Sequence, residues 1–257
     1  MKVSSRTRLL SKPDTHIKLT TISCVTILLL LLSIIPSKAM EISPALRVLL
    51  KIEKKFQEID SISGNFQKTI TMTNESVEIS GELHYKKPDK IRIIHSDPVA
   101  QDLRSDGKRL YFKSEKEDIN KELSSLSAEE RDTYSMVPGF GIDLLAPIKV
   151  ELYDFKTIED ELNTIKIVAI HKKNNVTAIE FGVDKKKNAV TFIKYRSYVG
   201  KEIYTTQIDF TDFKEIEKDN WFAMKVTVTA KDAFTQEETM YNNMKFNIEL
   251  EDSLFVM

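Results

Sequence analysis

The sequence is poor in the residues that most often build reactive sites. Among 257 residues it has one cysteine, four histidines, seven glycines and one tryptophan. Cys24 has no partner for an intrachain disulfide, and beyond residues 1–39 the chain offers no thiol nucleophile or cysteine metal ligand. Cys24 also precedes the leucines of an apolar run, whereas a lipidated cysteine follows such a run. We therefore expect no lipid anchor at this position.

Glycine and histidine are too few and too scattered for the common catalytic motifs. The glycines form no Gly-x-Ser-x-Gly sequence, phosphate loop or Rossmann fingerprint. His84, His95 and His171 lack a metal-ligand spacing such as His-x-x-x-His. In His95-Ser96-Asp97 the three groups of a triad are adjacent, but neighbours on a strand point to opposite faces, whereas a triad must converge. We expect no enzyme activity, no metal and no cofactor.

Neither sign of charge predominates. The 38 lysines and arginines nearly balance the 39 aspartates and glutamates. Residues 1–39 hold six basic residues and one acidic residue, so without them 32 basic residues face 38 acidic ones, a net charge of about −6. An acidic chain without a basic cluster is a poor candidate for nucleic-acid binding, so we expect no nucleic-acid partner.

The first 39 residues have the organisation of an export signal. A polar, basic stretch precedes the apolar run from Ile22 to Ile35, and Ser37 and Ala39 are the small residues before a cleavage point. This pattern predicts a signal peptide over residues 1–39 and one exported domain over residues 40–257. An uncleaved membrane anchor is the alternative, although the run is shorter than the roughly 20 residues that span a bilayer.

An amphipathic helix is predicted after this signal. Ser43-Pro44 supplies a favoured N-cap and a favoured first helical residue. A helical period near 3.6 relates the following residues, which would lie along one side of the helix: Ile42, Ala45, Leu46, Leu49, Leu50, Glu53, Phe56 and Ile59. Such a helix has one apolar stripe and must lie on an apolar surface.

Strands are predicted for most of the remaining chain. From Val77 to Tyr85 every second residue is apolar or glycine, the period of a strand with one wet face. Asp106-Gly107 predicts a type I′ hairpin turn. Further strands are expected near residues 66–72, 91–94, 101–105, 110–113, 150–155, 164–171, 177–183, 190–195, 202–210, 222–230 and 238–250. The predicted fold is mostly β within the α+β class: an open antiparallel barrel or strongly curved sheet.

The segment between the two groups of strands is less regular. Residues 114–120 are charged and are expected to form a loop. Ser127 and Glu130 match the capping box, which predicts a short helix as far as Tyr134. The apolar stretch from Phe140 to Pro147 is a second short helical candidate. Both pieces could cover the sheet as lids, or could be plain connecting turns.

The apolar faces of the helix and strands allow two interpretations. They could close on each other as a filled core, or leave a lined cavity that holds acyl chains. An apolar ligand in such a cavity gains about 0.8 kcal/mol for each buried methylene, without any catalytic group. The candidate lining residues are Leu46, Leu49, Leu50, Phe56, Phe66, Ile70, Leu83, Tyr85, Ile91 and Ile93.

A family resemblance favours the cavity. The sequence Gly81-x-Leu83-x-Tyr85-x-Lys87-Pro88-x-x-Ile91-Arg92, followed by Ser105-Asp106-Gly107-x-x-Leu110-Tyr111, resembles the LolA/LolB-type periplasmic lipoprotein carriers. Upstream, Phe56, Ile59, Ile62 and Gly64-x-Phe66-Gln67 are similar to that family's first helix and first strand. The C-terminal strands and Asp252-Ser-Leu-Phe255 are similar to the end of LolA-like sorting proteins.

The resemblance implies an unclosed β-barrel with short lid helices over an apolar cavity. It implies a periplasmic, monomeric carrier that takes acylated lipoprotein or lipid from the inner to the outer membrane. Its partners would be an inner-membrane release complex and an outer-membrane acceptor. Lys87 stands where the family has an arginine that latches the lid helix, and Ile91 stands where it has an aromatic residue that helps meet the release complex.

Two other functions stay open at this stage. One is a lipid- or glycolipid-sensing regulator on the same scaffold, similar to RseB-type proteins, which would need a stable protein partner. The other is an enzyme acting on an envelope polymer, which would need a convergent polar site that the sequence does not display.

Overall fold

The computed structural model describes residues 42–73, 75–126, 149–173, 178–199, 202–230 and 235–256, without the side chains of residues 197–199 and 202. The chain divides into two compact units, Met1–Ile42 and Ser43–Met257, and the fold below is that of the second unit. The predicted signal peptide over residues 1–39 lies outside the described residues. So do the helix predicted from Ser127 to Tyr134 and the apolar stretch from Phe140 to Pro147.

Helix α2, Pro44–Phe56, forms where the apolar periodicity predicts it. The hydroxyl oxygen of Ser43 accepts a hydrogen bond of 3.2 Å from the backbone N–H of Leu46, and this satisfies one of the free donors at the helix start. Lys54 and Lys55 lie in the last turn, where positive charge suits the negative end of the helix dipole. The capping serine and the basic last turn are therefore consistent with where the helix begins and ends.

Thirteen strands form one antiparallel sheet in the order β6-β5-β4-β3-β2-β1-β13-β12-β11-β10-β9-β8-β7. In the first half these are β1 Ser61–Met72, β2 Glu75–Lys86, β3 Lys90–Asp97, β4 Gln101–Asp106, β5 Arg109–Lys113 and β6 Asp118–Glu122. In the second half they are β7 Tyr153–Asp160, β8 Thr164–His171, β9 Ala178–Asp184, β10 Ala189–Val199, β11 Glu202–Glu217, β12 Asn220–Ala230 and β13 Thr235–Phe246.

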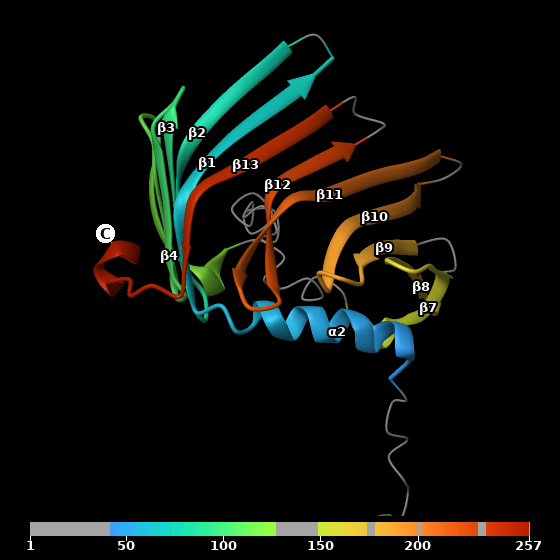
Figure 1. Cartoon of the computed structure of the whole chain (residues 1–257). Helices are drawn as coiled ribbons and strands as arrows, with labels where there is room; N and C mark the ends of the chain where they lie inside the picture. The colour runs from blue at the N-terminus through green and yellow to red at the C-terminus, as the bar shows by residue number, and fades with distance from the viewer. Residues whose placement is uncertain are drawn as a thin grey trace, which may run out of the picture. The chain divides into compact units, whose positions relative to one another are not determined.

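The sheet is strongly curved and open. Its order begins with β6 and ends with β7, and no strand pairing joins these two edges in the described part of the chain. Figure 1 shows the sheet bending around its hollow side, with α2 lying across one end of the strands. The predicted fold class, a mostly β open antiparallel sheet with an N-terminal helix, is therefore confirmed.

Several local predictions were wrong. Residues 118–120, expected to be part of a loop, belong to the edge strand β6, whose charges suit an exposed edge. Residues 150–152 form the 3₁₀ turn η2 ahead of β7. Asp106-Gly107 is not the centre of a type I′ turn: the connecting residues are Gly107 and Lys108, and only Gly107 has a positive φ. The carboxylate of Asp106 instead accepts hydrogen bonds from the backbone N–H groups of Lys108 and Arg109.

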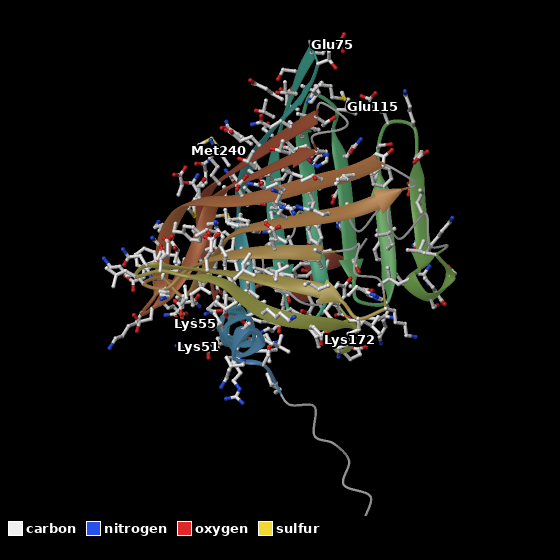
Figure 2. All side chains as sticks on the ribbon, turned by 90° about the vertical axis from the view of Figure 1, so that its right-hand side faces the viewer. Lys51, Lys55, Glu75, Glu115, Lys172 and Met240 are labelled. Carbon is white, nitrogen blue, oxygen red and sulfur yellow. The ribbon has the colours of Figure 1, made fainter. Side chains whose placement is uncertain are left out.

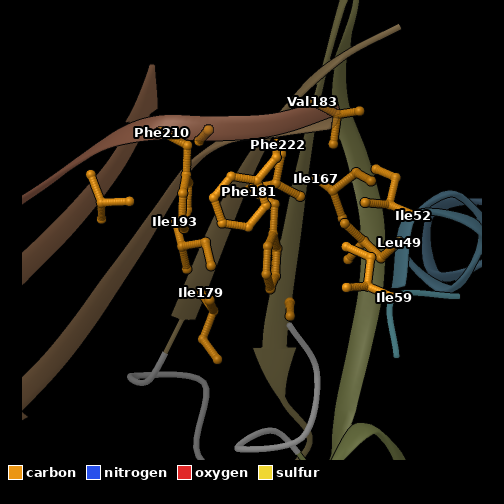
Figure 3. Packing of buried hydrophobic residues seen from close by; sticks show 14 of the residues in the cluster. Leu49, Ile52, Ile59, Ile167, Ile179, Phe181, Val183, Ile193, Phe210 and Phe222 are labelled. Carbon is orange, nitrogen blue, oxygen red and sulfur yellow. The ribbon is translucent and has the colours of Figure 1, made fainter. Parts of the chain in front are cut away.

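The core lies between α2 and the face of the sheet turned toward it, which we call the inner face. Leu49 and Ile52 of α2, together with Ile59, face Ile167 and Val183 of the sheet (Figure 3). Further along the same cluster, Phe181, Ile193, Phe210 and Phe222 pack against one another (Figure 3). Each fully buried side chain of this size contributes about 1.5–3 kcal/mol relative to exposure. The inner face next to α2 is thus a filled core.

The C-terminal segment covers part of the opposite, outer face of the sheet. The short 3₁₀ helix η4, Asp252–Phe255, packs near β3 and β4, and Phe255 is fully buried. The carboxylate of Asp252 accepts from the ammonium groups of Lys86 and Lys90 at 2.6 and 2.7 Å. Arg104 donates to the main-chain carbonyl of Val256 at 2.6 Å. The end of the described chain is therefore fastened to the sheet.

Candidate functional site

The inner face changes character with distance from α2. Along β1 the exposed fraction rises from 0 % at Ile62 to 8 % at Phe66 and 46 % at Met72. All three side chains point inward, because residues two apart on a strand share a face. We call the part beyond Phe66 the distal inner face. Its side chains on β1 are half-buried or exposed in this structure, so this is where a ligand could gain contact area.

The structure places all ten predicted lining residues, but not in one layer. Leu46, Leu49, Phe66, Leu83 and Ile93 are buried members of the core cluster. Leu50, Phe56, Tyr85 and Ile91 are partly buried and pack against that cluster. Ile70 is half-buried on the distal inner face and lies outside the cluster. Their role in lipid binding stays a prediction.

Sequence reasoning missed the residues that the C-terminal strands contribute to the distal inner face. Tyr195 of β10, Ile208 of β11 and Val228 of β12 are partly buried and pack against the core. Ile208 pairs with Ile193 on one side and with Val228 on the other, which fixes their common face. The alternation within each strand marked these residues as sharing a face, but only the strand order shows that they face the N-terminal strands.

An ion pair interrupts the apolar lining at the join between the two halves of the sheet. Lys68 follows Phe66 on the inner side of β1, and Glu237 follows Thr239 on the inner side of β13. The Lys68 ammonium lies 2.5 Å from the Glu237 carboxylate, and the two side chains are 21 % and 36 % exposed. The distal inner face is therefore amphipathic rather than uniformly apolar.

A ring contact next to this pair depends on a glycine. Phe66, Gly81 and His95 are level with one another on β1, β2 and β3. The rings of Phe66 and His95 meet edge to face with centroids 5.7 Å apart. A Cβ on Gly81 would lie 2.7 Å from the Phe66 ring and 2.0 Å from the carbonyl oxygen of Ile94. Gly81 thus allows the Phe66 ring to lie across β2.

His95 makes a side-chain hydrogen bond across the sheet, to β4. Its Nδ1 lies 3.0 Å from the side-chain oxygen of Gln101, whereas Ser96 and Asp97 are exposed. Burial lowers the pKa of His95, and the nearby charge of Lys68 acts in the same direction. His95 is therefore mainly neutral at pH 7, and the geometry agrees with the argument from alternating strand faces.

Lys87 connects the β2–β3 turn to the end of α2. Its ammonium donates to the main-chain carbonyl of Gln57, the C-cap residue of the helix. It also lies 3.3 Å from the carboxylate of Asp60, whose carbonyl accepts the Lys87 backbone N–H at 2.9 Å. Ile91, three residues after Pro88, points inward and is partly buried. Whether Lys87 acts as a latch stays a prediction.

The polar outer face carries its own charged cluster. The side chain of Asp102 accepts from Arg92 and Arg104 at 2.8 and 2.6 Å. Although burial favours the neutral acid, the hydrogen bonds from Arg104 and Arg92 hold the pKa of Asp102 below its ordinary value. Both guanidinium groups are engaged by this carboxylate, so the cluster joins β3 to β4 and offers no open reactive group.

The described residues contain neither a cluster of metal ligands nor a membrane-spanning helix. No set of three or more histidine, cysteine, aspartate or glutamate side chains is arranged to hold a metal ion among them. Likewise, none of the helices in this part of the chain has both the length and the apolar composition needed to span a bilayer. The burial gradient and the ion pair make the amphipathic distal inner face the candidate site.

Several solved structures share this fold. A domain described as an outer membrane lipoprotein-sorting protein from Vibrio parahaemolyticus is 15 % identical, with a TM-score of 0.60 over 82 % of this chain and 95 % of that chain. A DUF1329 family protein from Desulfovibrio piger is 11 % identical, with a TM-score of 0.62 over 82 % and 95 %. A LolA superfamily protein from Nitrosomonas europaea is 14 % identical, with a TM-score of 0.55 over 81 % and 97 %.

At these identities the structural neighbours show the fold alone. No curated protein matches the chain by sequence. A family model does: that of the outer membrane lipoprotein carrier protein LolA matches residues 57–225, which run from the end of α2 into β12. This match includes most of the inner face, and the resemblance seen in the sequence is confirmed: the chain belongs to the LolA family of outer membrane lipoprotein carrier proteins.

Proposed function

We propose that this protein is a periplasmic carrier that shields the acyl chains of a lipoprotein or lipid between the inner and outer membranes. The observation that carries the proposal is the change along the inner face, from a filled core at α2 to half-exposed apolar rows on the distal strands. A soluble domain that leaves inward apolar rows half-exposed has a surface suited to an apolar ligand.

Binding and transfer of an acyl chain need no catalytic group. If about ten methylenes of an acyl chain left water on this surface, they would gain about 8 kcal/mol, which corresponds to a Kd near 1 μM. Transfer would then follow the relative affinities of donor, carrier and acceptor. The carrier acts as a binding protein and not as an enzyme. An inner-membrane release complex and an outer-membrane acceptor would be its protein partners.

Acyl chains that co-purify with the protein test this proposal. Protein isolated from its own envelope without detergent is extracted with organic solvent, and the extract is analysed by mass spectrometry. We expect fatty-acyl species or an acylated lipoprotein in roughly stoichiometric amount. A wild-type protein that extracts free of acyl species, and that takes up no labelled lipid from vesicles, contradicts the proposal. A stable complex with a non-acylated protein would point to the lipid-sensing regulator instead.

A further inference from the structure

Lys68 and Glu237 lie within the apolar lining of the inner face, where charges are costly. On β1, Lys68 stands between Phe66 and Ile70, and its partner across the ladder on β2 is Ile79, which packs against the core. Desolvating an ion pair can cancel its Coulombic gain, so an apolar pair at these positions would serve folding equally well. Both side chains also keep contact with solvent. A pair that stability does not require, and that a ligand can reach, suggests recognition.

The two charges have a defined order along the sheet. In the β1–β13 ladder, Phe66 is level with Tyr241, Lys68 with Thr239, and Ile70 with Glu237. Moving away from α2, a ligand would therefore meet buried aromatic rings first, then the strand position of Lys68, and then that of Glu237, whose charged groups lie 2.5 Å apart. The strand positions are thus ordered apolar, positive, negative.

A phospholipid with an ethanolamine head has the complementary order: acyl chains, then a phosphate, then a primary ammonium. We propose that the distal inner face binds the head of such a zwitterionic phospholipid, with the phosphate on Lys68 and the ammonium on Glu237. This inference rests on the proposed function and specifies its cargo. Insertion of the head replaces one charge-assisted contact, Lys68 to Glu237, with two.

The neighbouring groups keep the site neutral overall. His95 lies next to Phe66, and its lowered pKa leaves it uncharged at neutral pH. Gln101 and Thr239 add only uncharged polar groups. A choline head cannot donate an N–H hydrogen bond to Glu237. A glycerol head leaves the phosphate charge unbalanced beside this carboxylate. Both should bind less well than ethanolamine.

Selective extraction of lipid from vesicles tests the proposal. The purified protein is incubated with vesicles that contain equal amounts of phosphatidylethanolamine, phosphatidylcholine and phosphatidylglycerol with identical acyl chains. It is then separated from the vesicles, and the bound lipid is quantified by mass spectrometry. We expect phosphatidylethanolamine to exceed each of the others about fivefold to tenfold, as befits one additional charge-assisted hydrogen bond. Glu237→Gln should abolish this preference while the protein still extracts lipid.

The double exchange Lys68→Glu with Glu237→Lys is the control variant matched to the wild-type protein. It retains an ion pair, the net charge and the apolar lining, but reverses the order of the charges. We expect unchanged thermal stability and loss of the phosphatidylethanolamine preference. Bound lipid in vesicle proportions, or a preference that survives the exchange, overturns the inference and leaves the carrier function standing. Extraction of no lipid at all contradicts both.

Discussion

The ammonium of Lys87 donates a hydrogen bond to the main-chain carbonyl of Gln57, the residue that caps the C-terminus of α2. This contact joins the β2–β3 turn to the end of the helix that lies on the core. Two further lysines bind the same helix to other turns: Lys51 reaches the side chain of Asn188, and Lys55 reaches the carbonyl of Asp219. Figure 2 shows Lys51 and Lys55 on α2, with Glu75 far away at the tip of the β1–β2 hairpin.

Removing the Lys87 contact should loosen the end of α2. For Lys87→Ala we expect a loss of about 0.5–1 kcal/mol of stability, because the lysine is partly exposed, together with greater binding of an apolar dye to the empty protein. Lys87→Arg can still donate to the Gln57 carbonyl and serves as the control. Fluorescence titration with the dye is the measurement. Unchanged dye binding in Lys87→Ala, with unaltered stability, would reduce Lys87 to an ordinary surface lysine.

A charge on the distal inner face should remove cargo without unfolding the protein. Ile208 is half-buried there, so Ile208→Glu places a carboxylate where acyl chains would lie, and burying it under cargo costs several kcal/mol. We expect a folded variant whose organic extract contains little acyl material by mass spectrometry. Thr205→Glu adds the same charge to the outer side of the same strand and should keep its cargo. Equal acyl content in both variants would refute this placement of the binding surface.

The same charge in the filled core should unfold the protein. Leu83 is 1 % exposed and Ile93 is 8 % exposed. In Leu83→Glu or Ile93→Glu the new carboxylate has no partner in the core, and the cost of several kcal/mol approaches the whole stability of a typical domain. Circular dichroism should show loss of the cooperative thermal transition. A variant that melts like wild type while losing its lipid would instead place these residues in an open cavity.

Gly81 should tolerate no side chain. In Gly81→Ala the Cβ would meet the carbonyl oxygen of Ile94 and the Phe66 ring at distances that force both to move. We expect a loss of about 1–3 kcal/mol, the usual cost of overpacking, measured as a lower urea midpoint with an unchanged slope. Ser80→Ala, at the neighbouring position on the same strand, should differ little from wild type. A Gly81→Ala protein as stable as wild type would show that β2 and β3 can separate there.

Acid should release the C-terminal segment. The hydrogen bonds from Lys86 and Lys90 lower the pKa of Asp252 to about 2, from an ordinary value of 3.8. A depressed carboxyl pKa gives stability that is present above pH 3.8 and is lost as the pH falls toward 2. The urea midpoints of wild type and Asp252→Asn should therefore differ at pH 7 and converge near pH 2. A difference that persists at pH 2 would assign the effect to something other than this ionisation.

The sequence by itself determined the secondary structure over most of the described chain. Ser43-Pro44 and the apolar stripe placed α2, because capping and helical periodicity are local properties. Alternation placed β8 at Thr164–His171, residue for residue. The prediction from alternation failed where the local sequence pattern conflicts with the pairing of strands in the sheet. Edge strand β6 is polar because it must avoid pairing with other chains. Strand β13 ends at Phe246, before Asn247, which has a positive φ and bonds to Asp60 and Glu217.

Only the tertiary structure decided which apolar residues form core and which remain available to a ligand. Alternation shows that Phe66 and Ile70 share a face, but their different burial depends on the distance of each from α2. Likewise, Lys68 and Glu237 lie in distant parts of the sequence, and each reads as an ordinary strand residue. The antiparallel pairing of β1 with β13 brings them together on the inner face. Register between distant strands is a non-local property, set by the packing of the whole sheet, and no local pattern encodes it.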